Sequence, residues 1–229
     1  MAPRKRPFTD REPDHPDDVF VARTLEFSEW ARQNTQILVV FGIVVVLLVG
    51  GALYYATYRE DLRQQAAVGL ERIHQTLGVG EVEAARAELV TYLDRFGGTS
   101  EAGEARLLLG QLYLQSGQAP LAVDVLGPTA ENLREPIGVQ AAMLLAKAHE
   151  ELGDPAEAER LYLAVADRAE LDFQITAALA DAARLRQRDG DRQGAADLYR
   201  RILDRLEADA EDRGLYEMRL QEVLTEAAD

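Results

Sequence analysis

The residue types that could bind a metal or act as nucleophiles are few and widely separated in this chain. The three histidines, His15, His74 and His149, stand in different segments, and no H-E-x-x-H, His-x-His or acidic ladder accompanies them. The sequence has no cysteine, which excludes a disulfide framework, a thiolate metal site and a cysteine nucleophile. We therefore expect no metal site.

The remaining candidates for catalysis also lack the context that a reaction requires. The serines have no nucleophile-elbow context, and the segment Gly78–Glu81 lacks the lysine and the length of a phosphate-binding loop. Acid pairs such as Glu150 and Glu151 are common on helix surfaces rich in Glu and Arg. We predict that the chain is not an enzyme and uses no cofactor.

Charge and composition narrow the class of partner. The formal net charge is −15, and nucleic acid is an unsuitable partner because phosphate neutralisation needs a concentrated basic surface. The content of 47% hydrophobic and 28% charged residues suits a folded helical domain rather than a disordered chain. Nucleic acid is therefore not among the expected partners.

Four glycines recur at a nearly constant interval. Gly80, Gly117, Gly153 and Gly190 are 37, 36 and 37 residues apart, and an alanine follows each of them after five residues. A period of this length predicts stacked helical hairpins, which bury their apolar faces only against neighbouring hairpins. The expected fold is therefore all-α, with a surface that binds other proteins.

Apolar spacing and helix-ending residues predict about four hairpins and a final helix, with the hairpin turns at the four glycines. Ser100 is expected to cap the first helix of the second hairpin, and Pro120 to begin its second helix. The third hairpin is predicted from about Pro136 and the fourth from about Leu171. An amphipathic helix from Arg213 is expected to cap the open end of the stack.

Residues in phase with the glycines are predicted to form the core. Small residues seven before and five after a glycine allow the paired helices to approach closely, and a bulky residue nine after it fills the space between hairpins. The positions seven before are Ile73, Gly110, Ala146 and Ala183, those five after are Ala85, Ala122, Ala158 and Ala195, and those nine after are Leu89, Leu126, Tyr162 and Tyr199.

Ahead of the repeats, residues 37–55 read as one transmembrane helix. These nineteen residues carry no charge, and a helix of that length spans roughly 28 Å. Trp30 precedes the run, and Tyr54, Tyr55 and Tyr58 close it, as in the aromatic belts of membrane proteins. A cleavable signal peptide and a buried core helix of a soluble protein are the alternatives.

The span divides the chain into four predicted parts: a disordered cytoplasmic tail at 1–17, a juxtamembrane helix at 18–36, the transmembrane helix at 37–55 and the repeat domain at 56–229. Residues 18–36 read equally well as a short solvated helix. Charges near the span are almost balanced, but the cluster Arg4, Lys5, Arg6 and Arg11 favours a cytoplasmic N-terminus and an extracytoplasmic C-terminal domain.

The repeat positions resemble the tetratricopeptide repeat (TPR), most clearly between Leu107 and Leu126, where Gly110, Tyr113 and Ala122 stand at positions of the motif. In the next unit Ala146 and His149 replace the glycine and the tyrosine, and later units depart further. The resemblance implies a right-handed superhelix, a TPR-like α-solenoid, whose concave groove receives peptides or partner helices.

The first helix of each hairpin supplies the groove in that family. The groove residues implied here are Leu107, Gln111, Leu114, Met143, Lys147, Arg184 and Arg188. They give a mixed, modestly basic groove without the Asn and Lys pattern that clamps a C-terminal carboxylate in chaperone-binding members. Alternatively, its three cations form a solvated helix face.

The whole layout resembles the ancillary SecYEG translocon subunit family: a short tail, a lead-in with Phe27 and Trp30, one span and four degenerate hairpins. This resemblance implies a single-pass protein of the bacterial inner membrane with a periplasmic repeat domain. It implies a scaffold that links the SecYEG translocon to periplasmic chaperones for protein export or envelope protein folding. The alternative is a structural scaffold for envelope or cell-division assembly. Such a scaffold would form a homo-oligomer through its helical stack or its membrane helix.

Overall fold

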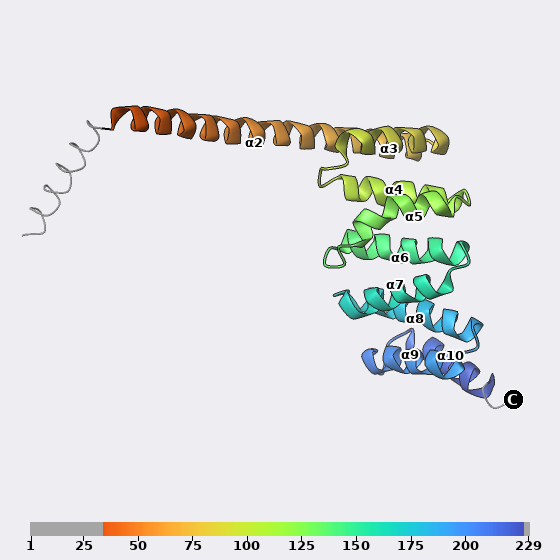
Figure 1. The fold of residues 1–229 in the computed structure, drawn as a ribbon. Helices are drawn as coiled ribbons and strands as arrows, with labels where there is room; N and C mark the ends of the chain where they lie inside the picture. Colours follow the sequence, from red (N-terminus) through yellow and green to blue (C-terminus); the bar gives the residue numbers. More distant parts are fainter. Residues whose placement is uncertain (1–33, 227–229) are drawn as a thin grey trace, which may run out of the picture. The chain divides into compact units, whose positions relative to one another are not determined.

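The computed structural model describes residues 34–226, and the regular elements of this range are all α-helices (Figure 1). In chain order the nine described helices are α2 (Thr35–Gly78), α3 (Val82–Phe96), α4 (Ala102–Gln115), α5 (Ala119–Ala130), α6 (Pro136–Glu151), α7 (Pro155–Arg168), α8 (Asp172–Arg188), α9 (Arg192–Arg205) and α10 (Arg213–Glu226). The predicted tail at 1–17 and nearly all of the predicted juxtamembrane helix at 18–36 lie outside the described residues.

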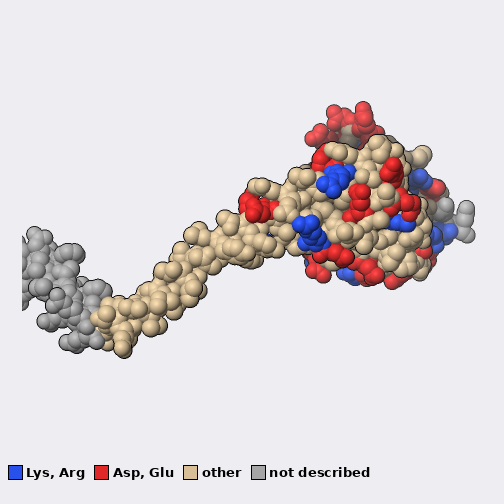
Figure 2. All heavy atoms as spheres, turned by 90° about the horizontal axis from the view of Figure 1, so that it is seen from above, with Lys and Arg blue, Asp and Glu red and all other residues tan. Residues whose placement is uncertain are grey.

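The chain consists of two compact units, and the boundary between them lies between Glu60 and Asp61. In the first unit, helix α2 contains the predicted span, whose apolar side chains are exposed and free of charge (Figure 2). The second unit contains the rest of α2 and the eight helices that follow it. Within the described residues the apolar segment does not form a buried core helix, because no part of its most apolar stretch is buried.

The second unit is a stack of helical hairpins. Each helix from α4 onward contacts the next along the chain, and α4 also contacts α6, so that the first helices of the second and third hairpins lie side by side (Figure 1). The pairs α4 with α5, α6 with α7 and α8 with α9 are the second to fourth predicted hairpins, and α10 closes the stack against α9. This architecture is the all-α solenoid that the glycine spacing predicts.

The four phased glycines end the first helix of each hairpin in the same way. Gly80, Gly117, Gly153 and Gly190 have φ values of 84°, 67°, 76° and 86°, and no other described residue has a positive φ. At the second turn, the amide of Gly117 donates to the Leu114 carbonyl at 2.9 Å, and that of Gln118 to the Tyr113 carbonyl at 2.8 Å. This pair of bonds is the Schellman motif, and it recurs at the other three turns.

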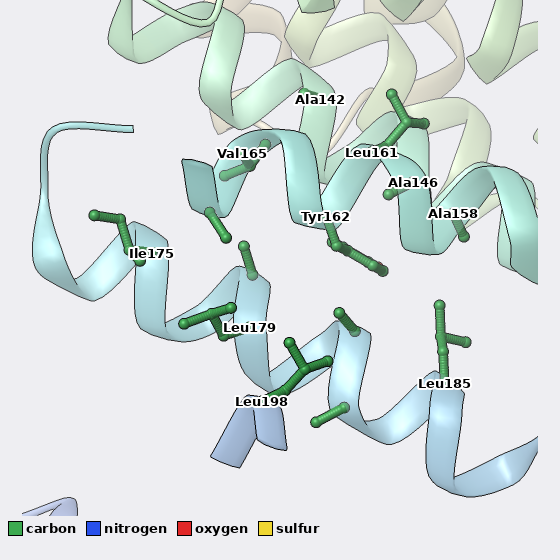
Figure 3. Packing of buried hydrophobic residues seen from close by; sticks show 14 of the residues in the cluster. Ala142, Ala146, Ala158, Leu161, Tyr162, Val165, Ile175, Leu179, Leu185 and Leu198 are labelled. Atoms are coloured by element: carbon green, nitrogen blue, oxygen red, sulfur yellow. The ribbon is translucent and has the colours of Figure 1, made fainter. Parts of the chain in front are cut away.

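The phased residues form the core as predicted. All four alanines five residues after the glycines are 0% exposed, and so are Leu89 and Leu126. The close approach is tightest at Gly110, where an added Cβ would lie 2.5 Å from Leu126 Cδ2 of the paired helix. Figure 3 shows Tyr162 of α7 directed toward α8, where it fills the space between two hairpins.

The prediction that Ser100 caps the second hairpin is wrong. Helix α4 begins at Ala102 without a side-chain cap, and the Ser100 hydroxyl donates to the Glu101 carboxylate at 3.1 Å. The reason is the preceding turn, in which Thr99 Oγ1 donates to the Phe96 carbonyl at 2.8 Å and the Ala102 amide to the Thr99 carbonyl at 3.3 Å. These bonds fix the chain before Ser100 can reach a cap position.

Helix α10 closes the stack with only part of its predicted apolar stripe. Val223 is 0% exposed, and Leu220 and Leu224 pack beside it against the core. By contrast, Leu215 and Met218 are 46% and 57% exposed. The stripe predicted for this helix therefore divides between the core and the outer surface.

Candidate protein-interaction groove

A groove crosses the first helices of three successive hairpins, and we call it the central groove. Its volume is approximately 370 Å³. Its lining residues come from α4, α6 and α8: Leu107, Gln111, Val139, Gln140, Met143, Leu144, Phe173, Gln174 and Ala177. Residues four apart in a helix lie on the same face, so each of these three helices presents a short row of side chains to the groove.

The lining contains apolar side chains and amides, and no Asp, Glu, Lys or Arg. Phe173 is 70% exposed at the start of α8, although an aromatic side chain of this size is usually at least half buried. Gln174 beside it is only 8% exposed, which puts an amide at the wall of the groove. In a chain with 28% charged residues, such a surface suits contact with uncharged parts of a protein ligand.

The structure brings together three of the seven predicted groove residues. Leu107, Gln111 and Met143 all line the central groove. Leu114 lies further along α4, one turn beyond Gln111 and two turns beyond Leu107, and is partly buried against the hydrophobic core. Lys147 is exposed on α6, one turn beyond Met143.

The two predicted arginines lie outside the central groove and are held by Glu150. Arg184 of α8 donates to both carboxylate oxygens of Glu150 of α6, at 2.7 and 2.9 Å, and Arg188 lies 4.0 Å from the same carboxylate. Tyr162 of α7 donates to Glu150 at 2.8 Å. The Glu150 carboxylate therefore joins three helices.

The electrostatics of this cluster follow from its burial and its donors. Burial raises the pKa of Glu150, but the hydrogen bonds from Arg184 and Tyr162 outweigh it, so the net pKa is lowered. Burial, followed by the Asp181 carboxylate and the hydrogen bond to Glu150, raises the pKa of Tyr162. At neutral pH the cluster is a carboxylate paired with guanidinium and phenol donors, and it fixes α8 against α6.

Six residues of the central groove were missing from the sequence prediction: Val139, Gln140, Leu144, Phe173, Gln174 and Ala177. The available signal was Phe173, which stands near the predicted start of a helix, outside the phased core positions. Neither Gln140 nor Gln174 carried a signal, because an amide on a helix is ordinary without knowledge of its neighbours.

The second unit is also hollowed near each of its ends. One hollow, of approximately 470 Å³, lies between α2 and α3 and includes Val68, Arg72, Arg95 and Phe96. Another, of approximately 270 Å³, lies between α8, α9 and α10. The central groove is the better candidate, because it spans three hairpins and is free of charge.

No metal centre is found over residues 34–226, where no three side chains of His, Asp or Glu lie close enough to share an ion. His74 meets Glu104 at 2.9 Å, and His149 lies 3.7 Å from Asp154. Each of the two described histidines is thus paired with one carboxylate.

The family model described as "Tetratricopeptide repeat-like domain" matches residues 28–225. The chain belongs to the tetratricopeptide repeat-like domain family. The match begins before the apolar segment, so it includes that segment together with the TPR-like hairpins. TPR-like repeats are generally non-catalytic scaffolds for protein–protein interaction.

Solved structures agree on the fold. A Podosopora anserina protein described as a kinesin light chain with nearly identical TPR-like repeats has a TM-score of 0.54 and 19% identity, covering 73% of this chain and 93% of that chain. A variant of the same protein gives 0.55 and 18% identity, covering 74% and 93%. At this identity the likeness concerns the fold alone. No curated protein matches the sequence.

Proposed function

We propose that this TPR-like protein is a membrane-anchored scaffold for protein–protein interaction, held at the bacterial inner membrane with its repeat domain in the periplasm. The observation that carries the proposal is the combination, in one chain, of an apolar helix whose side chains are not buried by the described residues and a solenoid with an open groove. The helix supplies the anchor, and the groove supplies the binding surface.

The physical case for anchoring rests on exposed apolar area. Side chains along the segment, such as Val46, Leu47 and Leu48, are 70%, 68% and 68% exposed. An unbroken apolar surface of this kind is unfavourable in water and favourable in the hydrocarbon of a bilayer. At the end of the segment the Arg59 guanidinium lies 5.7 Å from the centre of the Tyr55 ring, which suits the membrane interface.

The link to protein export comes from architecture. The order of lead-in, span and hairpins in the sequence resembles that of ancillary SecYEG translocon subunits, and the match to the tetratricopeptide repeat-like family begins at residue 28, ahead of the span. A tethered groove near the translocon would meet emerging chains or periplasmic chaperones. The partners proposed are therefore the SecYEG translocon and periplasmic chaperones.

Membrane attachment is tested by fractionation in alkaline carbonate, which removes peripheral proteins. The full chain is expected in the membrane pellet, and the double variant Val45→Arg with Val49→Arg in the soluble fraction, because each central arginine costs about 2.5–3.5 kcal/mol in a span. Val68→Arg is the matched control, since Val68 is 63% exposed in the repeat domain and outside the apolar run. A soluble full chain, or an N-terminus trimmed within residues 37–60, would contradict anchoring.

Orientation is tested by reporter fusions after Asp229. Alkaline phosphatase, which folds only outside the cytoplasm, is expected to be active, and a fluorescent protein that matures in the cytoplasm is expected to be dark. The reverse pair of results would overturn the periplasmic assignment while leaving the anchor and the groove unaffected.

A further inference from the structure

Lysine is almost absent from this chain. Lys5 and Lys147 are the only two lysines, and the other cations are arginines. Lys147 is exposed on α6, in the middle of the three helices that line the central groove. It lies four residues after Met143, which places it on the same helix face about 6 Å further along the axis.

Lys147 differs from the arginines on the same three helices because it has no partner. Arg106 of α4 donates to the Gly97 carbonyl at 2.8 Å. On α8, Arg184 and Arg188 meet Glu150, and Arg186 donates to Glu159 at 2.7 Å. Within α4, α6 and α8, Lys147 is therefore the one Lys or Arg without an ion pair or a hydrogen bond from its side chain.

The acidic groups near Lys147 do not neutralise it. Glu150 is held by Arg184 and Tyr162, as described above. Glu151, one turn beyond Lys147 on α6, forms no ion pair with it within 4.0 Å. The central groove thus has an uncharged floor and one free positive charge at its edge.

We propose that the central groove binds an extended or helical peptide segment with apolar side chains followed by one Asp or Glu, whose side-chain carboxylate pairs with Lys147. The apolar side chains contact Leu107, Met143 and Phe173, and the neighbouring glutamines hydrogen-bond to polar groups of the ligand. The positive charge at the edge selects the ligand by charge complementarity. The proposal rests on the proposed interaction function and adds the chemistry of the ligand.

Peptide selection tests the charge preference directly. The full chain in lipid nanodiscs is exposed to random peptides displayed on phage, with empty nanodiscs for counter-selection. The peptides are joined to the coat protein at their C-termini, so that a free terminal carboxylate cannot contribute. We expect enrichment of apolar residues next to a single Asp or Glu.

The most enriched peptide, synthesised with blocked termini, is then titrated against variants. Lys147→Glu is expected to weaken its binding by about tenfold and to select peptides with Lys or Arg instead, because attraction becomes repulsion. Arg192→Glu makes the same charge change at an exposed position on α9 and is expected to leave binding unchanged. Circular dichroism checks that both variants keep their helix content.

Carbodiimide crosslinking places the carboxylate. Because Lys147 is the only lysine after Lys5, a zero-length amide bond to the peptide acid is expected at Lys147 alone, and mass spectrometry maps it. Lys147→Arg keeps the charge, so binding is expected to persist while the crosslink is lost.

The outcomes separate the ligand chemistry from the broader function. Enriched peptides that bind the groove, as judged by loss of binding in Phe173→Glu, but show no acidic preference would overturn the role of Lys147 and leave the scaffold function standing. Peptides insensitive to Phe173→Glu would overturn the groove as their site. No enrichment above empty nanodiscs would contradict both the ligand chemistry and peptide capture by this domain.

Discussion

Replacing Gly117 with alanine tests whether the glycine repeat exists to end helices in a left-handed conformation. Gly117 has φ of 67°, and an added Cβ would have no neighbour within 4 Å, so the cost of Gly117→Ala is conformational and not steric. A left-handed backbone conformation costs a non-glycine residue about 1–2 kcal/mol. Alanine also lowers the conformational entropy of the unfolded chain, which offsets about 0.4–1 kcal/mol of this cost. The expected net loss of stability is about 1 kcal/mol.

Gly103→Ala is the matched control, because it makes the same chemical change inside α4. The backbone there has no positive φ, and the new methyl would meet Ile137 Cγ1 at an ordinary 3.7 Å. Alanine in a helix is favoured over glycine by about 0.5–1 kcal/mol, so this variant is expected to gain stability.

Thermal unfolding followed by circular dichroism compares the two variants. For a domain of this size, 1 kcal/mol corresponds to a change in Tm of about 2–4 °C. Gly117→Ala is expected to lower the Tm by that amount, Gly103→Ala to raise it slightly, and Gly117→Asn to cost less than alanine, since asparagine tolerates this conformation. A Tm that rises in both alanine variants would refute the conformational role of the repeated glycine.

Two further changes probe the core and the Glu150 cluster. Ala158→Leu is expected to destabilise the fold by about 1–3 kcal/mol, because Ala158 is 0% exposed, whereas Ala156→Leu on the exposed face of α7 should be nearly neutral; equal Tm values would contradict the packing. Glu150→Gln is expected to cost about 1–3 kcal/mol at neutral pH. The pKa of Glu150 is lower in the folded protein than in the unfolded chain, so the ionised carboxylate contributes its full stabilisation of the fold above the unfolded pKa of about 4.3. This stabilisation is lost as the pH falls below that unfolded pKa toward the folded one. The difference in unfolding free energy between wild type and Glu150→Gln, measured with urea, should therefore decrease as the pH is lowered. A difference that stays constant with pH would contradict the predicted direction of the pKa shift.

The periodic part of the sequence was sufficient to predict the fold. A glycine, an alanine and a bulky residue in phase describe one hairpin, and their repetition describes a stack, because each position has the same neighbours in every unit. The structure accordingly places Ala122 and Leu126 in the core and Gly117 in the turn. Such predictions succeed because they depend on local geometry and repetition.

Features that depend on one particular neighbour could not be predicted in this way. Arg184 was expected in the groove from its helix position, but its pairing with Glu150 joins residues 34 apart and requires the spacing of adjacent hairpins. The caps show the same limit: Asp154 accepts the Glu157 amide at 3.2 Å, whereas Ser100 does not cap its helix. Phe173 enters the central groove only because α8 begins beside α6.

The central claim is that the groove of a membrane-held solenoid is the surface that contacts partner proteins. The most direct measurement places a photoreactive amino acid at Gln111, in the groove, and at Leu121, which is 45% exposed on α5 outside it, in the full chain in intact membranes. The account predicts discrete adducts from Gln111 that disappear in Met143→Glu, and none from Leu121. Equal adducts from both positions, or Gln111 adducts that persist in Met143→Glu, would contradict it.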